Sequence, residues 1–252
     1  MSKVITVRGL EIGSGMPKIV APLMGASPTE IVDGAKNLVG LSVDVVEWRA
    51  DHFADICDTP SVLDVLADLR AALPHTPLLF TCRGKQEGGD KEISAADYTA
   101  LNKAVAESGL ADLIDVEIFS AGAMARQNIA NIHAAQVLVV GSHHDFLRTP
   151  PAAEIVARLQ MMQDMGADIL KIAVMPAKAA DVLTLLSAAL EMSQNAKQPL
   201  CAISMSGLGT ISRLAAGIFG SALTFGAAGT PSAPGQIPVE QLAKTIFLMH
   251  NA

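Results

Sequence analysis

The chain has 252 residues, of which 50% are hydrophobic and 17% charged, a composition that is typical of a folded protein and excludes an intrinsically disordered one. The net charge of −7 argues against nucleic-acid binding, and the three cysteines (Cys57, Cys82 and Cys201) offer no disulfide framework and no paired metal-ligand spacing. No apolar run approaches membrane-spanning length and residues 1–15 hold no secretion signal, so we predict a cytoplasmic protein without nucleic-acid or membrane partners.

A short hairpin is predicted first, with strands at residues 4–7 and 10–12 around the turn Arg8-Gly9. From residue 18 onward, apolar strands alternate with helices eight times. The predicted strands cover residues 18–24, 43–49, 78–83, 113–118, 137–142, 168–174, 200–205 and 222–226. The predicted helices cover residues 28–40, 60–73, 95–108, 121–135, 150–165, 179–195, 211–219 and 239–250. Four helices are expected to be capped by Ser27, Thr59, Ser94 and Thr149.

Eight strand–helix units in a chain of this length match the size of an α/β fold of the (β/α)8 TIM-barrel type. The alternative is a doubly wound open sheet, but the motif G-x-G-x-x-G is missing after the first strand. No linker or composition shift marks a second domain. We therefore predict a single barrel domain over residues 1–252, with the hairpin closing the bottom of the barrel. The Gly-, Pro- and Ser-rich stretch 227–238 is expected to act as a mobile lid.

The sixth predicted strand carries a lysine in its middle. Alternation places Ile169, Lys171 and Ala173 on one face, and residues 169–174 hold no other polar side chain. We therefore expect Lys171 to lie in an apolar setting, which favours the neutral amine and allows a Schiff base with a ketone or aldehyde. The alternative is a structural lysine whose ammonium group reaches water at the strand end.

Polar residues also lie at or just beyond the carboxyl ends of six other strands, where barrel enzymes place their catalytic groups. They are Glu47, Arg49, Arg83, Glu87, Asp115, Glu117, His143, His144, Arg213, Ser232 and Gln236. Parity with Ser142 directs His144, rather than His143, to the barrel axis, and a histidine there can move protons at neutral pH. The arginines suit a carboxylate ligand. Asp115 and Glu117 are either part of this site or a structural polar layer beneath it.

Five motifs, in this order, resemble the type I 3-dehydroquinate dehydratase family. They are Glu47-Trp-Arg-Ala-Asp51, Phe80-Thr-Cys-Arg83 with Glu87-Gly-Gly, Ser142-His-His-Asp-Phe146, Asp168-Ile-Leu-Lys171-Ile-Ala and Ser232-Ala-Pro-Gly-Gln236. The resemblance runs from the hairpin to the last helix. It implies the third step of the shikimate pathway, in which the small-molecule substrate 3-dehydroquinate loses water to give 3-dehydroshikimate. It also implies a homodimer with no metal and no dissociable cofactor.

The resemblance further implies roles for individual residues. Lys171 matches the Schiff-base lysine, His144 the general acid/base, and Glu87 the carboxylate that orients this histidine. The substrate contacts comprise Arg213, Ser232 and Gln236 at the substrate carboxylate, together with Glu47, Arg49 and Arg83. Two positions are unusual: Pro22 stands where some relatives have serine, and no role carries over to His143.

Two other functions are compatible with a lysine-bearing barrel. The first is a Schiff-base lyase of the aldolase or transaldolase type, which would favour a phosphate-binding loop over three arginines. The second is a non-catalytic barrel that binds a small acid, in which Lys171 would be inert. The second function predicts that Lys171→Ala leaves ligand affinity nearly unchanged.

Overall fold

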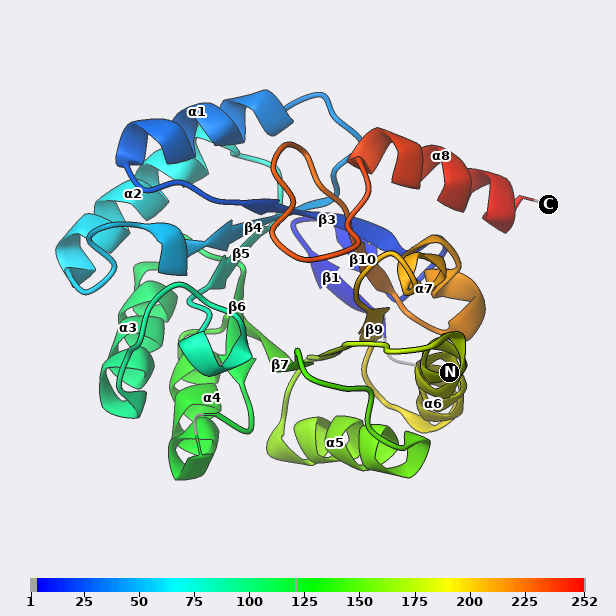
Figure 1. Ribbon diagram of the computed structural model, residues 1–252. Helices are drawn as coiled ribbons and strands as arrows, with labels where there is room; N and C mark the ends of the chain where they lie inside the picture. Colours follow the sequence, from blue (N-terminus) through cyan, green and yellow to red (C-terminus); the bar gives the residue numbers. More distant parts are fainter. Residues whose placement is uncertain (1–3, 121, 252) are drawn as a thin grey trace.

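Eight parallel strands form a nearly closed barrel that α-helices surround, as seen in the computed structural model, which describes residues 4–120 and 122–251 (Figure 1). The strands are β3 (Lys18–Leu23), β4 (Val45–Arg49), β5 (Leu78–Thr81), β6 (Leu113–Glu117), β7 (Leu138–Asp145), β8 (Ile169–Val174), β9 (Leu200–Ser204) and β10 (Leu223–Phe225). The α-helices are α1 (Pro28–Leu38), α2 (Thr59–Ala72), α3 (Ala95–Ser108), α4 (Ala125–Ala134), α5 (Ala152–Met165), α6 (Ala179–Asn195), α7 (Thr210–Leu214) and α8 (Val239–His250). The predicted (β/α)8 barrel is therefore confirmed.

The strands follow one another around the barrel in chain order. Hydrogen bonds link them in the order β10-β3-β4-β5-β6-β7-β8-β9, and each paired ladder is parallel. Between β9 and β10 the link is short: the Ala222 amide donates to the Leu200 carbonyl at 2.7 Å, and the Ala202 amide donates to the Ser221 hydroxyl at 3.0 Å. All eight carboxyl ends consequently point to the same mouth.

Strand β4 shows how alternation builds both the core and the site. Val46 and Trp48 are buried in the apolar layer between the strands and the helices. Val45 belongs to a separate apolar cluster inside the barrel, whereas Glu47 and Arg49, on the same face, line a cavity near the mouth. Because side chains alternate along a strand, the apolar layer on one face leaves the other free to carry polar groups.

The hairpin closes the bottom of the barrel, as predicted. β1 (Ile5–Val7) and β2 (Leu10–Ile12) pair antiparallel, and their turn has positive φ at Arg8 (47°) and Gly9 (82°), which suits a two-residue hairpin. Ile12 is completely buried. It shares an apolar cluster with interior residues near the amino ends of the strands, among them Val20, Val45, Leu79 and Leu113. The hairpin thus keeps water from entering the barrel opposite the mouth.

Two of the four predicted helix caps are correct. Ser27 and Ser94 each accept a hydrogen bond from the third residue of the helix that follows. Thr59 is wrong, because α2 starts one residue earlier than predicted and the Asp58 carboxylate accepts from the Ser61 amide at 3.1 Å. Thr149 is also wrong: its hydroxyl donates to the Met175 carbonyl, and α5 begins only at residue 152.

Asp58→Ala is expected to destabilise the protein by about 1 kcal/mol, because it removes the acceptor for an otherwise unpaired amide at the start of α2. Chemical denaturation measures the loss. Asp58→Asn keeps an acceptor oxygen and should retain most of the stability. Thr59→Ala should change the unfolding free energy less than Asp58→Ala; the opposite order would restore threonine as the cap.

Two other predicted helices differ from the observed ones because each contains a 3-10 turn. The predicted helix 211–219 is divided into α7 and a 3-10 turn at Ala216–Phe219. The predicted helix 121–135 begins as a 3-10 turn at Gly122–Met124 and continues as α4, and its first residue lies outside the described residues. No helix in the described ranges combines the length and apolar character that crossing a bilayer requires.

The predicted lid segment, residues 227–238, connects β10 to α8 and reaches over the barrel mouth (Figure 1, orange). Its base is joined by hydrogen bonds from the Ala227 amide to the Ile237 carbonyl at 2.8 Å and from the Val239 amide to the Ala227 carbonyl at 3.0 Å. Its Pro234 carbonyl accepts from the Ser206 amide at 3.1 Å, so the segment also contacts the loop after β9.

Candidate active site

One cavity at the mouth of the barrel is lined by all nine predicted site residues. They are Glu47, Arg49, Arg83, Glu87, His144, Lys171, Arg213, Ser232 and Gln236. Three apolar side chains, Phe146, Met205 and Phe225, form part of the remaining wall. The nine residues come from β4, β7 and β8 and from the segments after β5, β9 and β10, and they meet because these strands end at the same side of the barrel.

Lys171 does not lie in the apolar setting expected from its strand. The side chain is buried, and its Nζ lies 3.3 Å from Glu47 Oε1 and 3.6 Å from Asp115 Oδ2. The Phe225 ring covers the amine at 4.3 Å from Nζ to the ring centroid. The expectation is wrong because both carboxylates come from other strands of the barrel, β4 and β6. They offer nearby acceptors for a proton of the lysine.

Glu87 holds the imidazole of His144. Its Oε2 lies 3.0 Å from His144 Nδ1 and also accepts from the His144 amide at 2.9 Å. Burial would raise the pKa of Glu87, but hydrogen bonds from His143 and His144 and the charge of Arg83 outweigh it and hold the pKa well below its usual range. An ionised carboxylate only accepts hydrogen bonds, so the proton of His144 lies on Nδ1 and leaves Nε2 as a free acceptor.

His144 is a neutral imidazole at neutral pH. Burial and the positive charge of Arg83 lower its pKa, although the hydrogen bond to Glu87 raises it, and the result is a pKa of about 3. The side chain lines the cavity, so parity predicted correctly which of the two adjacent histidines faces inward. A neutral histidine with a free nitrogen is suited to accept a proton from a bound molecule.

Arg83 organises the polar groups under the cavity. Its guanidinium donates to Asp115 at 2.8 Å, to Glu117 at 3.0 Å and to the Ser142 hydroxyl at 3.0 Å. Burial alone would lower the pKa of Arg83, but the surrounding carboxylates raise it well above its ordinary value. Asp115 belongs to the site, because it also lies within ion-pair distance of the lysine.

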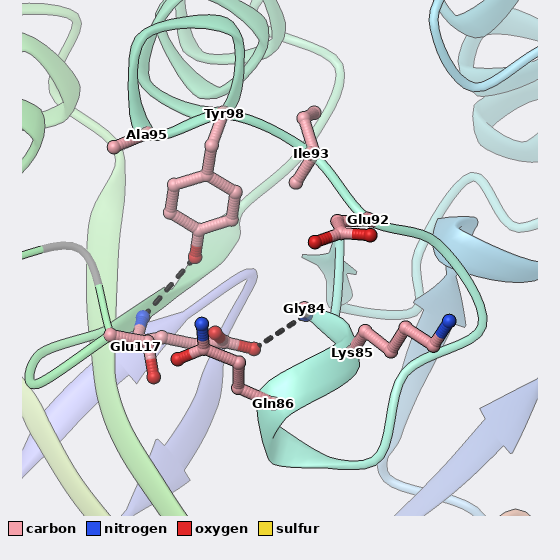
Figure 2. A pocket seen from close by; sticks show the side chains of 9 residues that line it. Gly84, Lys85, Gln86, Glu92, Ile93, Ala95, Tyr98 and Glu117 are labelled. Atoms are coloured by element: carbon pink, nitrogen blue, oxygen red, sulfur yellow. Dashed lines mark hydrogen bonds between the residues drawn. The ribbon is translucent and has the colours of Figure 1, made fainter.

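Glu117 contacts Arg83 and also lines a second cavity, which lies outside the barrel. Its carboxylate accepts from the Gly84 amide at 2.7 Å, and its own amide donates to the Tyr98 hydroxyl at 3.2 Å (Figure 2). Glu117 therefore supports Arg83 from behind and does not line the cavity at the mouth. The sequence left open whether Asp115 and Glu117 belong to the site or to a polar layer beneath it. Asp115 lies within ion-pair distance of Lys171, whereas Glu117 is structural.

Arg213 and Arg49 differ in how their charges are balanced. Arg213 is 1% exposed, and its guanidinium donates to the Phe225 and Pro234 carbonyls, each at 3.2 Å. Within the described ranges it forms no ion pair, and burial lowers its pKa to about 10. Arg49, in contrast, donates twice to Asp51 at 2.8 Å. Arg213 is thus the arginine whose charge calls for an anionic ligand.

The polar part of the lid segment adds further groups beside Arg213. The Ser232 amide donates to Gln236 Oε1 at 2.9 Å, and Gln236 Nε2 donates to the Ser232 hydroxyl at 3.1 Å. Both side chains line the cavity. Together with Arg213 they provide a cation, an amide and a hydroxyl, a set that suits a carboxylate.

Comparison with known proteins decides which family this site belongs to. The family model described as "Type I 3-dehydroquinase" matches residues 19–252. The chain belongs to the type I 3-dehydroquinase family. The chain is 46% identical over 252 residues to the 3-dehydroquinate dehydratase of Bacillus licheniformis, covering 100% of the chain and 99% of the relative. The Escherichia coli (strain SE11) enzyme is 47% identical over 251 residues, covering 99% and 100%.

A solved structure agrees with the sequence comparisons. The type I 3-dehydroquinate dehydratase of Clostridium difficile, described with covalent modified comenic acid, superposes with a TM-score of 0.96 at 46% identity. The alignment covers 100% of the chain and 99% of that structure. The family resemblance is confirmed, and the chain is a hydro-lyase. Membership of this family replaces the aldolase and non-catalytic alternatives.

Proposed function

We propose that this chain dehydrates 3-dehydroquinate to 3-dehydroshikimate through a Schiff base on Lys171, with His144 as general acid and base. The observation that carries the proposal is that three groups line one cavity: a buried lysine amine, a neutral imidazole and a buried arginine that has no carboxylate partner among residues 4–120 and 122–251. The substrate offers a matching ketone, an acidic C–H bond and a carboxylate. Placement at the third step of the shikimate pathway follows from the family.

Lys171 begins the reaction by attacking the C3 ketone. The attack releases water and leaves a protonated imine, which withdraws electrons and acidifies the neighbouring C2 proton. Glu47 lies 3.3 Å and Asp115 3.6 Å from Nζ, close enough to accept the proton that the amine must lose before attack. They also suit the positive charge of the iminium that forms at the same place.

His144 then makes the two proton transfers that dehydration requires. Its free Nε2 removes the C2 proton and the iminium becomes an enamine. The imidazolium that forms is stabilised by Glu87, which already accepts the Nδ1 proton at 3.0 Å. Donation of the Nε2 proton to the C1 hydroxyl expels water and restores the neutral histidine. Water then hydrolyses the iminium, which releases the product and frees Lys171.

Substrate contacts follow from the groups around the cavity. We assign Arg213, Ser232 and Gln236 to the substrate carboxylate. Glu47, Arg49 and Arg83 are assigned to the remaining polar contacts of the substrate. Two hydrogen bonds to Asp51 hold Arg49 in place, which fixes where its remaining N–H groups can reach.

Arg213→Ala is expected to raise the KM for 3-dehydroquinate about 10- to 100-fold, the size of one hydrogen bond to a charged group, with a smaller change in kcat. Steady-state kinetics measure both constants. Arg148→Ala, which removes an arginine side chain that is 57% exposed, is the matched control and should leave KM unchanged. A wild-type KM in the Arg213 variant would mean that the substrate carboxylate lies elsewhere.

Borohydride reduction with 3-dehydroquinate present tests the covalent step directly. We expect a mass gain on the intact protein that peptide mapping places on Lys171, because borohydride reduces the iminium to a stable amine. Dehydration without any adduct would replace the covalent route by an enolate route. Absence of both turnover and adduct would refute the proposed function.

Four further expectations complete the proposal: the homodimer and the absence of a metal or cofactor rest on the family resemblance, and the single domain and the location rest on the sequence. We propose a single-domain protomer over residues 1–252, a homodimer and a cytoplasmic location, with no metal or dissociable cofactor in the reaction. Light scattering coupled to size-exclusion chromatography measures the oligomer. Full activity after dialysis against a chelator is the expected result for a metal-free enzyme.

A further inference from the structure

We propose that His143, fixed by Arg158, is a positioning residue that holds the Glu87 carboxylate in the orientation that His144 needs. The inference rests on the proposed role of His144 as acid and base. It adds a function for His143, whose side chain faces away from the cavity.

Glu87 divides its hydrogen bonds between its two oxygens. Oε2 accepts hydrogen bonds from the backbone amide and from Nδ1 of His144. Oε1 faces a different pair of groups, the Ser120 hydroxyl at 2.6 Å and His143 Nδ1 at 3.3 Å. A carboxylate held at one oxygen only can rotate about its terminal bond, whereas donors at both oxygens fix its plane. The orientation of His144 therefore depends on what occupies Oε1.

The tautomer of His143 follows from its second partner. Arg158 Nη1 contacts His143 Nε2, and an arginine guanidinium only donates hydrogen bonds. Nε2 must therefore accept, so the single proton of the neutral ring lies on Nδ1 and points at Glu87. A proton on Nε2 would face the arginine charge directly. Arg158 thus selects the only tautomer in which His143 can donate to the carboxylate.

The surroundings of His143 keep this arrangement in place. The Phe119 ring packs edge-on against the His143 imidazole, with ring centroids 5.0 Å apart. The Arg158 guanidinium lies over the Phe119 ring, 5.8 Å from its centroid. Glu154, one turn before Arg158 on α5, balances the arginine charge. The ionisable groups facing His143 are therefore Glu87 on one side and the Glu154–Arg158 pair on the other.

Kinetics of His143 variants separate positioning from packing. His143→Ala is expected to lower kcat about tenfold, the lower end of the loss that follows when a residue orienting a metal-binding histidine is removed, with KM unchanged. His143→Asn can present an amide N–H to Oε1 and should recover most of the loss. Arg158→Gln should lower kcat in the same direction, because His143 is then free to change tautomer.

Arg148→Gln is the matched control. Arg148 also pairs with Glu154, but its side chain is exposed and it forms no hydrogen bond to His143. We expect wild-type kcat in this variant. A kcat for His143→Ala equal to wild type, or an asparagine variant as slow as the alanine variant, would contradict positioning.

Nitrogen-15 NMR of the imidazole rings tests the tautomers without turnover. We expect His143 in the wild-type protein to carry its proton on Nδ1, and His144 to become a mixture of tautomers in His143→Ala. An Nε2-protonated His143 would overturn the inference even if the enzyme is fully active. If turnover and the borohydride adduct on Lys171 are both absent while the expected tautomers are seen, the proposed function fails and the contact between His143 and Glu87 stands.

Discussion

Lys171→Ala is expected to reduce kcat for dehydration by about six orders of magnitude, the scale seen when an essential nucleophile is removed from an enzyme. Without the amine no iminium forms, so the C2 proton keeps the acidity of an ordinary proton beside a ketone. His144 and Arg213 are not changed by the substitution and should still bind substrate and align it. We therefore expect binding of 3-dehydroquinate to survive while turnover and borohydride trapping are lost.

Controls for this variant come from the same part of the chain. Lys178→Ala removes an exposed lysine beyond the end of β8 and should be fully active and fully trappable. Because Lys171→Ala leaves Glu47 without its cation and Asp115 with Arg83 alone, its thermal unfolding should be compared with wild type before its kinetics are interpreted. A folded Lys171→Ala protein with turnover within tenfold of wild type would remove covalent catalysis from the mechanism.

Most of the barrel is predictable because each strand–helix unit carries its own signal. The strands are apolar on both faces, and helix starts such as Ser27 and Ser94 are marked by side chains that pair with their own backbone. The prediction fails where a contact with another element of the fold determines the local backbone conformation. Ser212, inside the predicted helix 211–219, is tied to β9 by a bond from the Ser204 amide at 2.9 Å, and the regular helix ends two residues later.

The environment of Lys171 could not be predicted from β8 alone. Alternation within one strand shows which neighbours share a face, and those neighbours are apolar. The groups that surround the amine come from β4, β6 and β10, and their approach depends on how the barrel closes. The place of each site residue at a strand end was predictable, whereas the partner that each one finds across the barrel was not.

The two adjacent histidines show the same limit. Parity correctly directs His144 to the cavity, but it assigns no partner to His143. Both rings contact Glu87 because this carboxylate lies at the rim of the barrel, in the short 3-10 turn Lys85–Glu87 after β5. The arginine that completes the arrangement is on α5, 15 residues further along the chain, and no local pattern connects it to the site.

His144→Ala is expected to lower kcat by roughly 10²- to 10⁴-fold, the usual range for loss of a general acid or base. Schiff-base formation uses Lys171 and the carboxylates beside it rather than His144, so borohydride should still trap the substrate on this variant. His133→Ala, which removes an exposed histidine paired with Asp168, is the matched control and should keep wild-type kcat. Unchanged turnover in His144→Ala would remove this residue from the mechanism.

The pH profile gives a second, independent check on His144. Burial and Arg83 lower its pKa to about 3, against an ordinary value of 6.5. The free enzyme therefore holds the neutral base throughout the range from pH 6.5 down to about 3, and kcat/KM should show no acid limb near pH 6.5 that belongs to this residue. The unfolded chain binds a proton at His144 as the pH falls through 6.5, whereas the folded chain does not, so this histidine makes the protein less stable in acid. His144→Ala should accordingly lose less stability than wild type between pH 7 and pH 4, measured by chemical denaturation. An acid limb near pH 6.5 that moves with this substitution would mean that the imidazole is not shielded by its surroundings, and that Glu87 rather than burial sets its protonation.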